Sequence, residues 1–361
     1  MDDYDDGSSP GVELTILSDR NVGVVRRAGW AESIRRTGFN RRRHEAGLNA
    51  ARELNYTASC WNSPKAAREN RRRPHRILEV HVVERRGLMS QPIGVFDSGV
   101  GGLTVLKALR GRLPRRDFIY FSDTARVPYG RKPKEMVREF AYEIAWFLQQ
   151  LDVCGIVIAC NTASASALPQ LADDLEVPVW GVIDPGVEAA RRVTRSGHVA
   201  VIGTKGTIAS GVYQGKLEAL GLKVWAQACP MFVHLVEEGL AESEEAEVLA
   251  RHYLAKMPDV DTLILGCTHY PVLAPVIQRV AGPDVTLVSS AEVTADVVAA
   301  ALGGDNADGS SRVTHYVTGG VPAYQHTAEV IGGVEGKVIP LDVTRLSDAG
   351  RSVRSSAPRI A

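Results

Sequence analysis

Two of the five cysteines occupy matching places in the sequence. Cys160 ends the apolar run Ile-Val-Ile-Ala and is followed by Asn-Thr, whereas Cys267, 107 residues later, ends Leu-Ile-Leu-Gly and is followed by Thr-His. Each pattern predicts the end of a strand and the start of a turn. A thiol near a helix N-terminus has a lowered pKa, because backbone N–H groups favour the thiolate. We therefore interpret this repeated pair as reactive thiols rather than as packing residues.

The other three cysteines, Cys60, Cys154 and Cys229, stand in no comparable pattern, and we expect them to be inert. The sequence lacks the apolar stretch of a secretion signal, so reduced thiols are the default. Metal binding is a rival use for thiols, but there is no C-x-x-C pair, and Cys267-Thr-His269 alone is weak ligand spacing. We expect no metal site.

One further side chain could assist Cys267. His269 lies two residues past it and could stabilise a thiolate or donate a proton. Glu237 and Glu238 end an apolar stretch, where a solvated helix end would explain them, and the sequence alone would not select either glutamate.

Two polar turns follow predicted strands. The first, Asp97–Gly102, reads Asp-Ser-Gly-Val-Gly-Gly, and its N–H groups could hold an anion. It departs from the dinucleotide fingerprint, because the third glycine of that motif would fall at Thr104. A carboxylate is therefore as suitable a ligand for this turn as a phosphate. The second turn begins at Asp123 and ends in Pro-Tyr-Gly, and it could present backbone N–H groups and the Tyr129 phenol to a ligand.

These turns must be positioned by an α/β framework. Short apolar runs alternate with helical patterns from Ile93 onward, which is typical of a parallel sheet covered by helices. A helix is expected over Lys134–Asp152, with Met136, Phe140, Ile144, Leu148 and Leu151 on its buried stripe. The expected strands are Ile93–Phe96, Phe118–Phe121, Gly155–Ala159, Val177–Gly181, Val199–Gly203, Lys223–Ala226, Thr262–Gly266 and Val285–Val288.

The framework carries an internal repeat. The strand before Asp97 recurs about 106 residues later before Gly203, and the Cys160 strand recurs before Cys267 in the same order. This predicts two similar α/β lobes, each offering one cysteine at the C-terminal end of a strand, where open α/β sheets bind ligands. We expect residues 89–187 and 290–345 to form the first lobe, 188–289 the second, and 346–361 a flexible tail. The cleft between the lobes would hold the active site.

The net charge of the whole chain is zero, but its two parts carry opposite net charges. The 42 basic and 42 acidic side chains give a net charge of zero, which argues against a nucleic-acid binder built on a large basic field. Residues 1–88 hold 17 basic and 12 acidic side chains, a net of +5, so the remainder carries −5. The first 88 residues show no sustained hydrophobic period. We interpret them as a disordered extension, or as untranslated sequence before Met89; an interaction arm is the alternative.

Together the motifs resemble the glutamate racemases of the cofactor-independent aspartate/glutamate racemase family, over roughly residues 93–341. The resemblance implies two acid–base thiols, with Cys160 taking the α-proton from D-glutamate and Cys267 from L-glutamate. It implies that Glu237 and Thr207 assist. The residues that it implies for substrate binding are Asp97, Ser98, Tyr129, Gly130, Asn161, Thr162, Thr268 and His269.

The resemblance also implies the setting of the reaction. It implies a cytoplasmic isomerase that supplies D-glutamate for peptidoglycan, with glutamate as its partner, no cofactor, and no requirement for nucleic acid or a membrane. The resemblance leaves open whether the protein forms a homodimer. Other substrates, aspartate or a hydantoin, are the first alternative. The second is a thiol hydrolase using Cys267 with His269, or a non-catalytic anion-binding protein; neither explains the matching Cys160.

Overall fold

The computed structural model describes residues 15–18, 21–24, 91–304, 311–344 and 346. The chain divides into two compact units, residues 1–80 and 81–361. The described part of the first unit consists of two short antiparallel strands, β1 (Thr15–Ser18) and β2 (Asn21–Val24). Apart from these strands and Leu346, the predictions for residues 1–88 and 346–361 lie outside the described residues.

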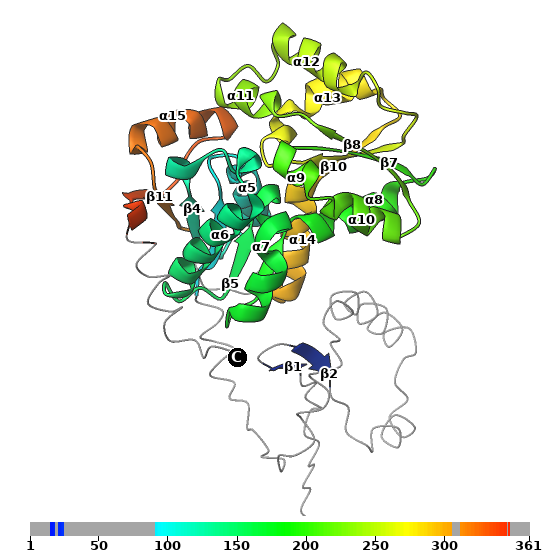
Figure 1. Cartoon of the computed structure of the whole chain (residues 1–361). Helices are drawn as coiled ribbons and strands as arrows, with labels where there is room; N and C mark the ends of the chain where they lie inside the picture. The colour runs from blue at the N-terminus through cyan, green and yellow to red at the C-terminus, as the bar shows by residue number, and fades with distance from the viewer. Residues whose placement is uncertain (1–14, 19–20, 25–90, 305–310, 345, 347–361) are drawn as a thin grey trace, which may run out of the picture. The chain divides into compact units, whose positions relative to one another are not determined.

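Six parallel strands form the first sheet of the second unit, in the order β12-β11-β4-β3-β5-β6. The central strand β3 is buried along its whole length, as expected where helices cover both faces of a sheet. Helices α6 and α7 contact each other and lie side by side in front of this sheet (Figure 1). The elements of this part are β3 (Ile93–Asp97), α5 (Leu103–Arg112), β4 (Phe118–Ser122), α6 (Lys134–Gln149), β5 (Gly155–Ile158), α7 (Asn161–Asp174), β6 (Val179–Gly181), β11 (Val313–Val317), α15 (Val321–Ile331) and β12 (Lys337–Pro340).

Four parallel strands form the second sheet, in the order β10-β9-β7-β8. Helices α12 and α13 lie on one side of it and α8 and α10 on the other (Figure 1). The elements are α8 (Ile183–Val193), β7 (His198–Gly203), α9 (Lys205–Ala209), α10 (Val212–Ala219), β8 (Lys223–Ala228), α11 (Met231–Glu237), α12 (Glu244–Leu254), β9 (Thr262–Gly266), α13 (Ala274–Ala281), β10 (Thr286–Ser289) and α14 (Ser290–Ala301).

The two sheets share one strand order. The run β4-β3-β5-β6 in the first sheet matches β8-β7-β9-β10 in the second, so in each case the first strand along the chain lies between the second and the third. The strands that the internal repeat pairs, β3 with β7 and β5 with β9, therefore occupy equivalent places. This confirms the predicted two-lobed parallel α/β fold.

The lobe boundaries stay a prediction, and one of them meets a helix. Residue 187 falls inside α8, which begins at Ile183 and contacts β9 and β10 of the second sheet. Helix α14 contacts both α5 and α8, so it joins the two halves of this unit. Among the described residues, no helix combines the length and the apolar character needed to cross a bilayer.

Helix α6 confirms the predicted stripe in part. Ile144 and Leu148 are buried as predicted, whereas Met136 is 41% exposed and Phe140 and Leu151 are half-buried. The helix also ends at Gln149 rather than at residue 152. The buried positions 137, 141, 144 and 148 follow the i, i+4, i+7, i+11 spacing of one helical face.

Two strands of the first sheet were absent from the prediction. Strand β11 alternates buried and half-buried residues and places His315 in the interior, so it lacks the continuous apolar run of the other strands. The buried imidazole is satisfied by the Tyr324 hydroxyl at 2.9 Å from Nδ1 and by the Glu335 carbonyl at 3.0 Å from Nε2. Strand β12 is a four-residue edge strand that ends in Pro340.

Candidate active site

Cys160 occupies the N-cap of α7, directly after β5. Its side chain is 6% exposed; Sγ accepts a hydrogen bond from the Ala163 N–H at 3.5 Å and lies 3.7 Å from the Ser98 hydroxyl oxygen. Burial raises the pKa of this thiol to about 12, and the charge of Asp97 acts in the same direction, whereas the Ala163 and Ser98 contacts lower the pKa. The expectation of a lowered pKa at Cys160 is therefore wrong, because desolvation outweighs the helix N-terminus.

Cys267 follows β9 and begins a chain of three side chains. His269 Nδ1 lies 3.8 Å from the Cys267 Sγ, and Nε2 of the same ring lies 3.0 Å from Glu237 Oε1. Burial lowers the pKa of His269, but its hydrogen bonds to Cys267 and Glu237 outweigh burial and raise the pKa to about 10. Glu238 ends the same helix but is exposed, so Glu237 is the glutamate that reaches the histidine.

The turns after β3 and β9 touch. The Thr104 hydroxyl donates to the Thr268 carbonyl at 2.9 Å. A Cβ atom built on Gly101 would lie 2.4 Å from both His269 Nδ1 and Thr268 Oγ1, so only a glycine fits there without displacement. The charge of Cys267 also raises the pKa of Cys160, so the two thiols influence each other. The structure thus brings residues of both predicted lobes into one site.

Asp97 is fully buried at the end of β3. Its Oδ2 accepts the Gly99 N–H at 3.0 Å, while Oδ1 has no hydrogen-bond partner among the described residues. Burial raises the pKa of this carboxyl, and nearby His269 lowers it. A buried oxygen without a donor costs about 1–3 kcal/mol, so Oδ1 is a group that a ligand donor would satisfy.

Asn161 and Thr162 form the first turn of α7. The Asn161 Oδ1 accepts the Tyr213 hydroxyl at 2.8 Å, and its Nδ2 is buried with no partner in the described part of the chain. The Thr162 hydroxyl lies 2.9 Å from that of Thr204 and 3.1 Å from that of Thr207. Since Thr204 is the N-cap of α9 and Thr207 lies in α9, directly after β7, these hydroxyls are a second contact between the segments that follow strands of the two sheets.

Tyr129 is hydrogen-bonded within its own turn. The ring is 1% exposed and the phenol donates to Asp123 Oδ2, so contact of this hydroxyl with a ligand stays a prediction. The Asp123 carboxylate also accepts from Arg126 Nε at 2.8 Å and from the Thr318 hydroxyl at 2.8 Å. This network holds the turn, whose backbone could also bind a ligand. The next residue, Gly130, abuts Thr204: a Cβ there would lie 2.7 Å from the Thr204 Cβ.

Sequence reasoning missed one residue of this cluster, Tyr213 on α10. Its ring is fully buried, and its spacing to Leu217, four residues on, is typical of an ordinary core helix. Nothing in the sequence distinguishes it from a core aromatic. The described residues contain no group of three or more His, Cys, Asp or Glu side chains suited to a metal ion.

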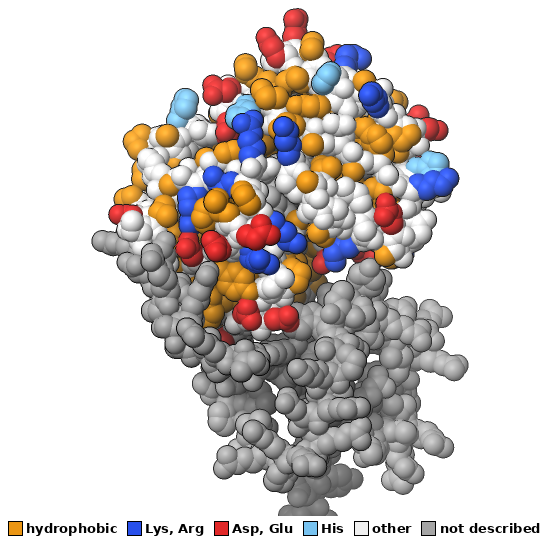
Figure 2. Space-filling view, in the orientation of Figure 1, with side chains coloured by type: hydrophobic (Ala, Val, Ile, Leu, Met, Phe, Trp, Pro, Cys, Tyr) orange, Lys and Arg blue, Asp and Glu red, His pale blue; other side chains and the backbone are white. Residues whose placement is uncertain are grey.

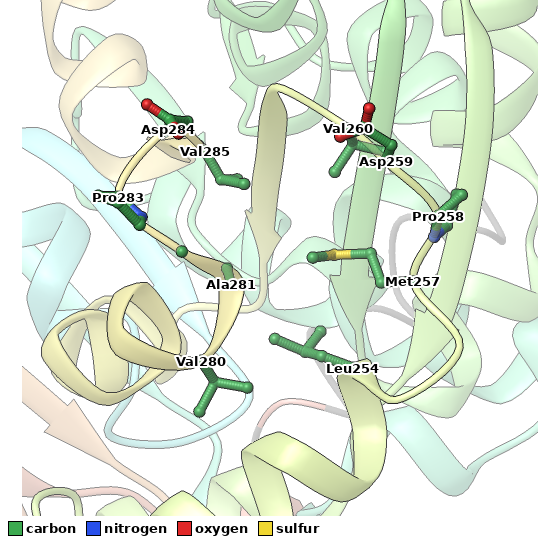
Figure 3. A pocket seen from close by; sticks show the side chains of 11 residues that line it. Leu254, Met257, Pro258, Asp259, Val260, Val280, Ala281, Pro283, Asp284 and Val285 are labelled. Carbon is green, nitrogen blue, oxygen red and sulfur yellow. The ribbon is translucent and has the colours of Figure 1, made fainter.

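A pocket of about 400 Å³ lies elsewhere in the second lobe (Figure 3). Leu254, Val260, Val280 and Val285 contribute to its lining. Val260 precedes β9 and Val285 precedes β10, so the pocket is at the N-terminal ends of these strands. Cys267 follows the C-terminal end of β9, so the pocket is separate from the thiol cluster.

Both the sequence and the fold of this chain are similar to those of known racemases. The profile of a family described as Asp/Glu/Hydantoin racemase matches residues 103–298. A glutamate racemase of Thermus thermophilus is 55% identical over 245 residues, covering 67% of this chain and 92% of the relative. One from Geobacter metallireducens is 51% identical over 238 residues, covering 64% and 88%. The crystal structure of the Thermus thermophilus enzyme with β-chloro-D-alanine matches with a TM-score of 0.67 and 53% identity, over 71% of this chain and 98% of that one.

Proposed function

This chain belongs to the Asp/Glu/Hydantoin racemase family, and we propose that it interconverts L- and D-glutamate, with Cys160 and Cys267 as the two acid–base groups. The glutamate racemases that it resembles at 51–55% identity are covered over 88–92% of their length, which supports glutamate as the substrate. The product D-glutamate would serve peptidoglycan synthesis.

The observation that carries the proposal is the pair of thiols at equivalent strand ends in two lobes of the same strand order. Racemisation takes the α-hydrogen from one face of Cα and returns a proton to the other face. Without a cofactor to delocalise the carbanion, one group must act as base while an opposed group acts as acid. Two matching thiols meet this need, and each direction of the reaction exchanges their roles.

The surroundings of the thiols set their resting states. Burial keeps Cys160 protonated, whereas Cys267 faces the imidazolium of His269. In this state the Cys267 thiolate would remove the α-proton of L-glutamate, and the Cys160 thiol would protonate the opposite face. For D-glutamate the Cys160 thiol must first lose its proton. A charge on Cys267 would raise the pKa of Cys160 further.

Two buried unpartnered atoms fit the substrate's polar groups. Asp97 Oδ1 can accept from the α-ammonium group, and Asn161 Nδ2 can donate to a carboxylate. Charge that develops on the α-carboxylate during proton removal is stabilised by such oriented donors in a site without water. The backbone of Tyr129 and Gly130 is available for the second carboxylate.

Deuterium incorporation at Cα tests the proposal. In D2O the wild-type protein should exchange the α-hydrogen of both enantiomers while the circular dichroism of glutamate decays to zero. Cys160→Ala and Cys267→Ala should each lower racemisation by about a thousandfold, within the range of general acid–base catalysis. Cys154→Ala is the matched control, since Cys154 is a buried free thiol outside the site. Full activity in either of the first two variants would refute the two-thiol scheme.

Substrate choice within the family is decided by the same assay. Aspartate and a hydantoin, measured beside glutamate, should racemise far more slowly. Added pyridoxal phosphate should leave the rate unchanged, because the two thiols carry out both proton transfers. A strong dependence on pyridoxal phosphate would contradict this mechanism.

A further inference from the structure

We propose that Tyr213 is a positioning residue: its phenol fixes the side-chain amide of Asn161 so that Nδ2 is presented to the α-carboxylate of the substrate. The inference deepens the proposed function and rests on it. Tyr213 lies on α10 of the second lobe, and Asn161 begins α7 of the first lobe, next to Cys160.

The contact is short and buried. The Tyr213 hydroxyl donates to Asn161 Oδ1 at 2.8 Å, Tyr213 is 0% exposed and Asn161 is 2% exposed. Burial raises the pKa of Tyr213, so the phenol keeps its proton throughout the working pH range and acts as a donor. The amide oxygen is thereby engaged, and Nδ2 is the half of the amide left without a partner in the described structure.

An asparagine amide has two orientations that differ only in which end carries the donors. With Oδ1 toward Tyr213, the two N–H donors are left for a ligand. In the opposite orientation a carbonyl oxygen would face the substrate carboxylate, and two acceptors would repel each other. The phenol proton selects the productive orientation, because the opposite one would leave the phenol O–H facing another donor and a buried carbonyl oxygen without a donor.

Tyr213 is itself held against the turn that carries the other thiol. A Cβ atom built on Gly266, the residue before Cys267, would lie 3.3 Å from Tyr213 Cε2, so the ring packs against the end of β9. On its hydroxyl side a Cβ on Gly186 would lie 3.4 Å from the phenol oxygen. The ring therefore has little freedom, and its hydroxyl links the turn after β9 to the residue beside Cys160.

Tyr213→Phe removes this hydroxyl and keeps the ring. We expect kcat/KM for racemisation to fall about tenfold, the loss that follows from about 1.4 kcal/mol of a lost hydrogen bond. The fall must be equal for both enantiomers, since the equilibrium constant of racemisation is unity. The control is Tyr324→Phe, which removes another buried hydroxyl, hydrogen-bonded to His315, and should leave kcat/KM unchanged.

The decisive measurement is the double variant. Because Tyr213 acts through Asn161, Tyr213→Phe should cause no further loss of kcat/KM in an Asn161→Ala background. A merely structural role would lower kcat/KM by the same factor in both backgrounds, and that result would overturn the proposal. Unchanged kcat/KM in Tyr213→Phe, in a wild type that racemises glutamate, would also overturn it.

A second readout does not depend on the folding of the variant. In the ¹⁵N-labelled wild type, the side-chain amide signal of Asn161, assigned by its loss in Asn161→Ala, should shift when glutamate binds. An unmoved signal at saturating glutamate would overturn the proposal even where racemisation is intact. A wild type that does not racemise glutamate would overturn the proposed function and this inference with it.

Discussion

At the scale of single residues, the two thiols are chemically unequal although their sequence contexts match. Cys160 is surrounded by buried groups and lies near Asp97, so burial raises its pKa to about 12. Cys267 instead has His269 at 3.8 Å, backed by Glu237. If the two thiols are the acid–base pair, as proposed, we therefore expect Cys160 to act as the acid in the resting enzyme, with Cys267 beside the His269 cation.

The His269–Glu237 pair predicts a dependence of stability on pH. The pKa of His269 is raised from 6.5 to about 10, so its contribution to the free energy of unfolding is complete below pH 6.5 and is lost as the pH rises through about 10. Glu237→Gln removes one cause of the shift, so this loss should occur at lower pH. Urea unfolding at pH 6, 8 and 10 measures it.

Glu238→Gln is the matched control for that experiment, since Glu238 is adjacent but exposed. It should leave the pH dependence of the free energy of unfolding as in the wild type. The alkaline limb of kcat/KM should move to lower pH in Glu237→Gln alone, because Glu237 helps to raise the pKa of His269, which then loses its proton at lower pH. Identical pH profiles in the two variants would contradict this assignment.

At the scale of elements, the turn after β3 fits against the turn after β9 only because it contains glycine. Gly101→Ala would place a methyl group 2.4 Å from His269 Nδ1 and Thr268 Oγ1, which must displace the histidine from Cys267. We expect kcat/KM to fall about a hundredfold, as displacements of about 1 Å at a site can cause. Gly111→Ala in the following helix meets no atom within 4 Å and is the control.

The Gly111→Ala control also has an expected sign. Replacing an exposed helical glycine by alanine stabilises a helix by about 0.5–1 kcal/mol, so this variant should unfold at higher temperature with unchanged kcat/KM. Calorimetry and the racemisation assay together check the pair. Equal activity in Gly101→Ala and Gly111→Ala would show that the two turns do not need their close approach.

The elements also show what sequence patterns could and could not reveal. The eight predicted strands are present because parallel strands buried on both faces leave continuous apolar runs, as in β3 and β9. Strand β11 was not predicted because its interior position is occupied by His315 rather than by an apolar residue. The two ring nitrogens of His315 are hydrogen-bonded to Tyr324 and Glu335, which lie in other parts of the chain. On α6, Val137 and Ala141 are buried where the sequence pattern predicted Met136 and Phe140, because tertiary packing selects the buried face.

The same limit applies to the site. Spacing and residue type were enough to single out Cys160 and Cys267, because each follows a recognisable strand. The raised pKa of Cys160 was not predictable, since it depends on burial and on Asp97, 63 residues earlier in the chain. Tyr213 was missed because its partner Asn161 lies 52 residues away and its own surroundings are those of a core aromatic.

At the scale of the whole molecule, the repeated strand order explains why one site draws on both lobes. Equivalent strand ends carry the two thiols, and hydroxyl contacts between the turns, such as Thr162 with Thr204 at 2.9 Å, join the lobes beside them. Acidic and basic side chains are interspersed on the visible face (Figure 2), and residues 89–361 carry a net charge of −5. We therefore expect a substrate with two carboxylates to be held by local donors rather than attracted by the overall field.

All candidate site residues lie between Asp97 and His269, whereas residues 1–80 belong to a separate compact unit. We therefore expect a chain that starts at Met89 to racemise glutamate with kcat/KM within about twofold of the full chain. A twofold change corresponds to under about 0.5 kcal/mol in transition-state stabilisation. Deuterium exchange into both enantiomers measures it. Arg41–Arg43 changed to alanine in the full chain is the control for charge. A large loss on truncation, with none in the arginine variant, would show that residues 1–88 support catalysis by more than their charge.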